Sequence, residues 1–258
     1  MSLTCPLRPV TAIAHPPKRG LCSWSVQRGE LQRRQLPSPR LVKRRCAASD
    51  KPGLPTQTYS SGSLSVEMPL ATVQQLPEPQ QAAVVAAVFA ALGSLTFLSC
   101  SVLAPALEAA LPDFMAFSRS TWPLLGTTFV AAGYAHFALH DAFVTMMPRP
   151  GAWGFWNLPG SPSFHVNWTG VAELAGGAGV LLGAVPQIAD AAPWLGPAAA
   201  AGLFALSVAV YPANVYMYTH NAPGPGPAGV PIPPAGHAAR FLLQVFLLST
   251  LWGLAHPV

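Results

Sequence analysis

Charged side chains are scarce in this sequence, and their scarcity excludes an ordinary soluble domain. Asp, Glu, Lys and Arg make up 9% of the 258 residues, whereas 51% of the residues are hydrophobic. A typical soluble domain has about 25% charged residues. A chain so poor in charge predicts an integral membrane protein.

Cysteine is also scarce, and its distribution argues against thiol redox chemistry within the chain. Three of the four cysteines lie in the first 46 residues, so only Cys100 belongs to the apolar part of the sequence. A single cysteine cannot form an internal disulfide, and there is no Cys-x-x-Cys motif. A self-contained dithiol oxidoreductase is therefore not expected.

Acidic residues are almost absent from the N-terminal segment. Residues 1–51 hold 11 of the 14 Lys and Arg residues but only Glu30 and Asp50, giving a net charge of +9; residues 52–258 carry −4. This segment is rich in Ser, Pro and Arg and lacks apolar periodicity, which is typical of an organellar transit peptide and not of a nucleic-acid-binding face. We predict a transit peptide over 1–48, cleaved between about Arg45 and Ala48 and directed to a chloroplast in preference to a mitochondrion. A basic tail that stays attached is the alternative.

Five apolar stretches follow, each about as long as the ~20 residues that cross ~30 Å of hydrocarbon. They predict transmembrane helices at about 81–104, 121–140, 166–186, 194–218 and 237–255. The Pro-, Ser- and Thr-rich residues 49–80 before them predict a flexible linker. The expected fold class is therefore all-α, a polytopic transmembrane helix bundle over 81–258.

The connection between the second and third stretches is rich in aromatic residues. Residues 146–164 are interrupted by Pro and Gly and contain Trp153, Phe155 and Trp156. Aromatic residues at this density predict a loop in the headgroup zone of the bilayer.

Glu173 is the one carboxylate within the third stretch. An acid in hydrocarbon costs ~2.5–3.5 kcal/mol on insertion scales, so it normally faces a partner or a cavity. Gly179-x-x-x-Gly183 on the same stretch predicts a small-residue packing face for a neighbouring helix. Glu173 is interpreted either as a proton-handling or ligand-binding acid, or as a structural acid hydrogen-bonded between helices.

Two histidines four residues apart, His136 and His140, share one face of the second stretch, with Tyr134 nearby. This spacing could supply ligands to a metal or an axial haem ligand, but no cysteine or acidic cluster accompanies it. No metal site is therefore predicted, and haem stays an alternative cofactor. A hydrogen bond between His136 and Glu173 would satisfy both side chains.

Further polar residues lie on the last two stretches. Asn214 follows Pro212, which should kink its helix, and Tyr216 follows two residues later. Arg240 and Gln244 are four residues apart on the fifth stretch. Arg240 is the only base within the predicted bundle, and we expect it to be the counter-ion of Glu173.

Four motifs occur in order on the second to fifth stretches. They are Gly133-Tyr134-Ala135-His136-Phe137, Thr169-Gly170-Val171-Ala172-Glu173-Leu174-Ala175-Gly176-Gly177, Tyr211-Pro212-Ala213-Asn214-Val215-Tyr216-Met217 and Arg240-Phe241-Leu242-Leu243-Gln244. Together they resemble the DoxX-like family of small four-helix membrane proteins, over about residues 122–256. That family shows Gly-x-x-His-Phe, Ser/Thr-Gly-x-x-Glu-x-x-Gly-Gly, Phe-Pro-Ala-Asn-x-x-Met and Arg-x-x-x-Gln elements. The stretch at 81–104 and the targeting peptide are additions to this pattern.

The resemblance implies a four-helix core in which a polar pocket forms. The stretch at 81–104 adds one N-terminal transmembrane helix to this core. Its candidate residues are His136, Glu173, Asn214, Arg240 and Gln244, with Tyr134, His140 and Tyr216 as secondary candidates. Relatives are linked loosely to membrane redox chemistry, including a subunit of a thiosulfate:quinone oxidoreductase. The lone Cys100 does not allow the sulfur chemistry to be carried over.

The leading hypothesis is a DoxX-like protein of a chloroplast membrane, either thylakoid or inner envelope, that binds a quinone or another prenyl-lipid or supports membrane redox chemistry. Its expected partners are the lipid bilayer and subunits of a membrane redox or photosynthetic complex, and no nucleic acid. One alternative is a structural or assembly factor without catalysis. Another is a small transporter, although no internal inverted repeat supports it.

Overall fold

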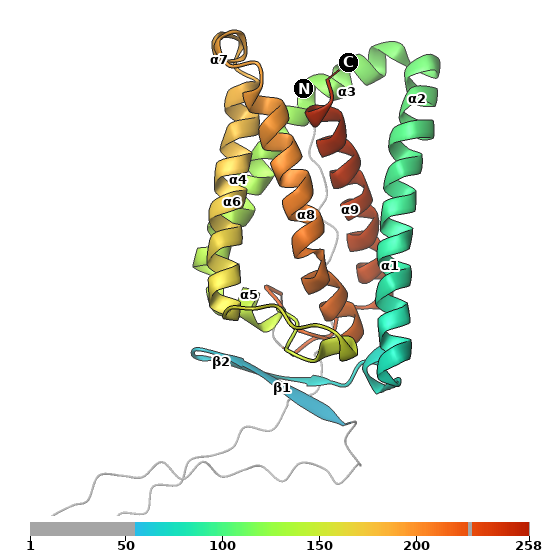
Figure 1. The fold of residues 1–258 in the computed structure, drawn as a ribbon, viewed down its shortest axis with the longest axis vertical. Helices are drawn as coiled ribbons and strands as arrows, with labels where there is room; N and C mark the ends of the chain where they lie inside the picture. The colour runs from blue at the N-terminus through green and yellow to red at the C-terminus, as the bar shows by residue number, and fades with distance from the viewer. Residues whose placement is uncertain (1–54, 227–228, 258) are drawn as a thin grey trace, which may run out of the picture. The chain divides into compact units, whose positions relative to one another are not determined.

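The computed structural model describes residues 55–226 and 229–257, which form a helix bundle with a β-hairpin at one end (Figure 1). The strands are β1 Thr56–Ser61 and β2 Leu64–Pro69. The helices are α1 Glu78–Leu98, α2 Ala104–Ala110, α3 Pro112–Thr121, α4 Leu125–Ala138, α5 His140–Thr145, α6 Pro162–Gly183, α7 Pro186–Ala191, α8 Leu195–His220 and α9 Pro234–Ala255. The predicted transit peptide, 1–48, lies outside the described residues, as does the start of the predicted linker.

Three helices of the described part of the chain are long and apolar enough to cross a membrane: Glu78–Ala110, α8 and α9. They correspond to the first, fourth and fifth predicted spans. The second predicted span contains α4, whose 14 residues extend only about 21 Å at 1.5 Å per residue. The third corresponds to α6, which has 22 residues but carries polar side chains in its first turns, among them His165 and Asn167.

The sequence predicts that the first apolar helix ends just before Pro105, but the helix continues past this residue. Residues Ser99–Leu103 form a π-helical turn, in which the Ala104 N–H donates to the Ser99 carbonyl. Pro105 then occupies the first turn of α2, where its missing N–H costs little. The helix therefore continues through the proline to Ala110.

The remaining long helices pack in chain order, α4 on α6, α6 on α8 and α8 on α9, and α1 packs on α9 (Figure 1). Glycines allow α4 and α6 to approach closely. A Cβ added to Gly170 would lie 2.7 Å from the Cβ of His136, and one added to Gly133 would lie 2.7 Å from the Gly170 carbonyl oxygen. The predicted small-residue face of α6 lies against α8, because Gly179 contacts Ala199 and Gly183 contacts Gly196.

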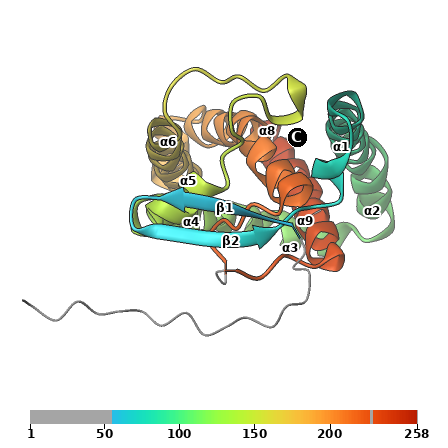
Figure 2. The same cartoon turned by 90° about the horizontal axis from the view of Figure 1, so that it is seen from below.

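The interpretation of residues 49–80 as a flexible linker is wrong for 56–69, which form an antiparallel hairpin. Gly62, with φ +51°, begins the two-residue turn between Ser61 and Leu64, a position that favours glycine. Tyr59, which pairs with Val66, and Met68 are buried on one face of the hairpin, in the core shared with α1, α8 and α9. Seen from below, the hairpin lies across the end of the bundle (Figure 2).

The hairpin and the aromatic loop together close the C-terminal end of α8. The Tyr59 hydroxyl donates to the His220 carbonyl at 2.6 Å, and the Asn221 side chain donates to the Pro69 carbonyl at 3.0 Å. Trp153 is only 2% exposed and donates its indole N–H to the Thr219 hydroxyl at 2.9 Å. Trp153 is therefore a core residue at this end of the bundle, and the depth of the aromatic loop in a bilayer stays a prediction.

Candidate functional site

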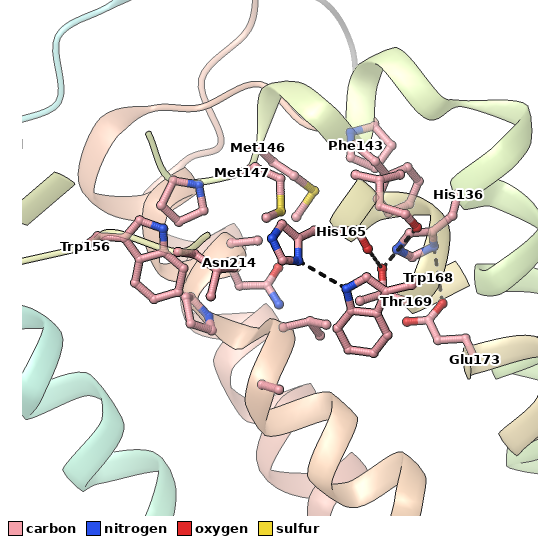
Figure 3. Close-up of a pocket in the computed structure, with 18 of the residues that line it drawn as sticks. His136, Phe143, Met146, Met147, Trp156, His165, Trp168, Thr169, Glu173 and Asn214 are labelled. Carbon is pink, nitrogen blue, oxygen red and sulfur yellow. Dashed lines mark hydrogen bonds and ion pairs between the residues drawn. The ribbon is translucent and has the colours of Figure 1, made fainter. Parts of the chain in front are cut away.

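A cavity of about 340 Å³ opens between α4, α5, α6, α8 and the start of α9 (Figure 3). Four of the five residues predicted to form a polar pocket line it: His136, Glu173, Asn214 and Arg240. The rest of the lining is mainly apolar and aromatic. It comprises Phe143, Met146, Met147, Pro148, Trp156, Leu158, His165, Val166, Trp168, Thr169, Ala209, Val210, Pro212, Ala213 and Pro225.

Glu173 lies on the buried side of α6 and is 7% exposed. Its Oε2 atom is fully buried and has no hydrogen-bond partner among the described residues. The nearest cationic or imidazole nitrogen is His136 Nδ1, 3.3 Å away (Figure 3). A buried polar atom left without a partner costs about 1–3 kcal/mol, so the carboxylate is available for a group that enters the cavity.

The expected hydrogen bond between His136 and Glu173 does not form, although the two side chains are neighbours. His136 Nδ1 lies 2.9 Å from the Ala132 carbonyl oxygen, which can only accept, so this nitrogen carries the ring proton. A neutral ring then has its lone pair on Nε2, for which no described residue is a donor. Phe143 of α5 stacks on the imidazole at a centroid distance of 4.0 Å and fixes the plane of the ring.

Arg240 is not the counter-ion of Glu173. Its Nη2 donates to Asn214 Oδ1 and to the Met217 sulfur, and it forms no ion pair with a carboxylate of the described residues. The Arg240–Asn214 hydrogen bond joins α9 to α8 directly after Pro212. Glu173 and Arg240 therefore border one cavity without neutralising each other.

The other predicted residues lie outside this cavity. Gln244 donates to the Ser207 carbonyl of α8 at 3.3 Å. Tyr134 is 67% exposed on the outer face of α4. His140 begins α5 and lies 3.7 Å from Asp141. Tyr216 is buried beneath the hairpin and stacks on His220.

Sequence reasoning missed three side chains of α6 that face the cavity, His165, Trp168 and Thr169. His165 Nε2 donates to the Pro159 carbonyl at 2.8 Å, and its Nδ1 accepts from the Trp168 indole at 3.1 Å (Figure 3). The ring is thus held in one tautomer at the cavity mouth. The spacing of His165, Thr169 and Glu173, four residues apart along α6, is a signal that could have found them.

The apolar wall is built by residues that adapt to a flat or irregular ligand. Met146 and Met147 follow α5, and Trp156 extends from the aromatic loop (Figure 3). Methionine side chains fill irregular gaps and contact aromatic rings favourably. Trp168 is 41% exposed and forms part of the rim. Within the described ranges, no three His, Cys, Asp or Glu side chains gather closely enough to hold a metal ion.

A family model described as "Domain of unknown function (DUF8561)" matches residues 125–255, half of the chain. The chain belongs to the DUF8561 family. The DUF8561 region begins with α4 and ends with α9, so it contains every residue that lines the cavity, whereas the hairpin and α1 precede it. No curated protein and no solved structure matches the chain.

Proposed function

We propose that this chain is a membrane protein of DoxX-like architecture, with α4, α6, α8 and α9 as its core and α1 as an added span, and that its cavity binds the headgroup of a quinol or another hydroxylated prenyl-lipid. The composition of residues 1–51 supports a plastid membrane as its location. The single observation that carries the proposal is Glu173, a carboxylate of the cavity wall whose buried Oε2 atom has no hydrogen-bond partner among the described residues.

The polar atoms around the cavity specify the complementary groups of such a ligand. The Glu173 carboxylate and His136 Nε2 both accept hydrogen bonds, so the ligand should bring a hydroxyl to this side. The Asn214 amide N–H₂ and the Arg240 guanidinium donate from the other side, where a second ligand oxygen would accept. A quinol has oxygens at both ends of a flat ring and meets both requirements.

The remaining lining favours a flat, largely apolar ring. Ligand sites are mostly apolar with a few convergent polar groups, and they typically enclose about 300–1,000 Å³. The cavity of about 340 Å³ lies at the lower end of this range and suits a headgroup, with the prenyl chain outside it. The Glu173 carboxylate and His136 Nε2, which are both acceptors, would be the groups that take the proton of the bound hydroxyl.

The test is the ligand content of the purified protein. The protein would be washed in detergent, incubated with a prenylated benzoquinol, separated from free ligand and extracted for mass spectrometry. Glu173→Gln removes the charge of the carboxylate, and Glu67→Gln makes the same change on the exposed face of the hairpin. We expect stoichiometric binding by wild type and Glu67→Gln. Glu173→Gln should bind about tenfold more weakly, because a hydrogen bond to a charged group contributes roughly 1.5–3 kcal/mol.

Two results would refute this function. One is a wild-type protein that binds no more benzoquinol than an equal quantity of detergent micelles. The other is equal binding by wild type and Glu173→Gln, which would remove the carboxylate from the site.

The Arg240–Asn214 hydrogen bond favours a second candidate, a structural or assembly factor whose polar residues only hold the helices together. This candidate predicts that substitution of Glu173 lowers the stability of the protein and has no separate effect on ligand binding.

A further inference from the structure

A second cavity, of about 310 Å³, lies on the other side of Arg240, between α1, α8 and α9. Tyr211, Asn214, Val215 and Tyr218 lie on one face of α8, three or four residues apart, and form one wall. The opposite wall is the first two turns of α9, from Pro234 to Phe241. Arg240 and Asn214 border both cavities and separate them.

The second cavity is lined by hydrogen-bond donors that the described residues leave free. Arg240 forms both of its side-chain hydrogen bonds to described residues through Nη2, so Nη1 and Nε have no acceptor among these residues. The hydroxyls of Tyr211 and Tyr218 and the ring of His237 form no side-chain hydrogen bond with any described residue. Tyr218 and His237 meet edge to face at the mouth, with ring centroids 5.3 Å apart.

The charge of this cavity is positive. No carboxylate lines it, and Arg240 forms no ion pair within the described part of the chain. A half-buried cation without a counter-ion is costly, and more so beside hydrocarbon. The first turn of α9 adds the positive end of a 22-residue helix, whose N-cap Pro233 has no side chain that could accept its N–H groups.

We propose that this second cavity binds the phosphate group of an anionic membrane lipid. A phosphate presents several acceptor oxygens in a tetrahedral arrangement, which suits donors from Arg240, His237 and the two tyrosines on separate sides. A carboxylate has only two oxygens and would leave some of these donors without a partner. The proposal does not depend on what occupies the first cavity.

The helix that holds Arg240 favours a lipid over a free anion, because its outward-facing side chains are apolar. Leu242, Leu243 and Phe246 follow Arg240 on α9 and are each more than 60% exposed. Acyl chains that descend from the cavity would lie along this apolar surface of a helix long and apolar enough to span the membrane.

Thermal unfolding and native mass spectrometry of the delipidated protein test the proposal. Three additions are compared in the same zwitterionic detergent: phosphatidylglycerol, phosphatidylcholine, and inorganic phosphate against chloride at equal ionic strength. His237→Gln and Tyr218→Phe each remove a donor at the mouth, and Arg240→Gln removes the charge. His256→Gln is the matched control, since it makes the same change at the exposed opposite end of α9.

Phosphatidylglycerol should raise the unfolding temperature of wild type and remain bound in the mass spectrum, whereas phosphatidylcholine should do so more weakly. His237→Gln and Tyr218→Phe should each weaken phosphatidylglycerol binding about fivefold, as expected for one lost hydrogen bond; His256→Gln should not. Stabilisation by inorganic phosphate that matches the lipid effect would identify a free anion as the source of the phosphate group. The proposal is overturned if neither phosphatidylglycerol nor phosphate binds. It is also overturned if His237→Gln and Tyr218→Phe both bind phosphatidylglycerol as well as wild type does. This outcome can be measured even if Arg240→Gln does not fold.

Discussion

Replacing Glu173 with leucine should stabilise the ligand-free protein. Glu173 is 7% exposed, and its Oε2 has no described hydrogen-bond partner. Leucine fills a similar volume without a polar atom. Removal of the unpaired oxygen should therefore recover about 1–3 kcal/mol of free energy of unfolding.

His136 does not change this expectation. Its Nδ1 proton is already donated to the Ala132 carbonyl, so loss of the carboxylate leaves no new unpaired donor on the ring. For a protein of about this size, 1 kcal/mol shifts the midpoint of thermal unfolding by about 2–4 °C. The midpoint of Glu173→Leu should therefore lie about 2–12 °C above that of wild type.

The assay is thermal unfolding in detergent, followed by tryptophan fluorescence, after endogenous lipids have been removed. Glu67→Leu on the exposed hairpin face controls for the general effect of replacing an acid with leucine. A midpoint several degrees below wild type would refute the reasoning, because it would show that the carboxylate stabilises the bundle. That result would favour the structural or assembly role.

Three further predictions concern the packing and the end of the bundle. Gly170→Ala should lower the free energy of unfolding, measured by urea titration, by about 1–3 kcal/mol, because the new Cβ would lie 2.7 Å from the Cβ of His136. The control is Gly202→Ala, whose new Cβ would meet nothing within 4 Å; it should leave the free energy of unfolding unchanged or raise it. Burial raises the pKa of Tyr59 above its usual value of about 10. The unfolded chain therefore releases this proton first, so stability should fall as pH rises above about 10, and Tyr59→Phe should remove that part of the fall. Trp153→Phe loses one buried hydrogen bond and should lower unfolding stability by about 1 kcal/mol or more, measured by thermal unfolding.

The long apolar helices could be predicted from the sequence because hydrophobic length alone defines them. Residues 81–104 and 237–255 each fall within a helix that is apolar enough to span a membrane, and 194–218 begins one residue before such a helix. Their ends were harder to predict. The helix beyond Pro105 depends on a π-helical turn, a change in hydrogen bonding that composition does not encode.

The hairpin was missed because its strands are short and the first of them is polar. The six residues of β1 are all Thr, Gln, Tyr or Ser and resemble a linker in composition, and only Tyr59, Val66 and Met68 of the two strands are buried. Their burial depends on the end of α8, more than 150 residues away in the chain. The alternation around Gly62 was the local signal that could have identified the turn.

The candidate site was predictable in its residue types but not in its pairing. Complementary polar residues on successive apolar stretches indicated His136, Glu173, Asn214 and Arg240, and all four line one cavity. Opposite charge suggested a Glu173–Arg240 ion pair, but Arg240 bonds to Asn214 instead, because α8 packs on both α9 and α6. Charge type alone cannot reveal this packing.

The central claim is that a prenyl-lipid headgroup lies in the cavity beside Glu173, and photolabelling tests it most directly. A prenylated benzoquinol with a photoactivatable group on its ring would be bound to the membrane-embedded protein and irradiated, and the labelled peptides would be mapped. We expect labels at 143–147 and 165–173 that unlabelled benzoquinol displaces. Labels only at outward-facing aromatic residues such as Phe97 and Phe117, which are 66% and 69% exposed, would contradict the claim.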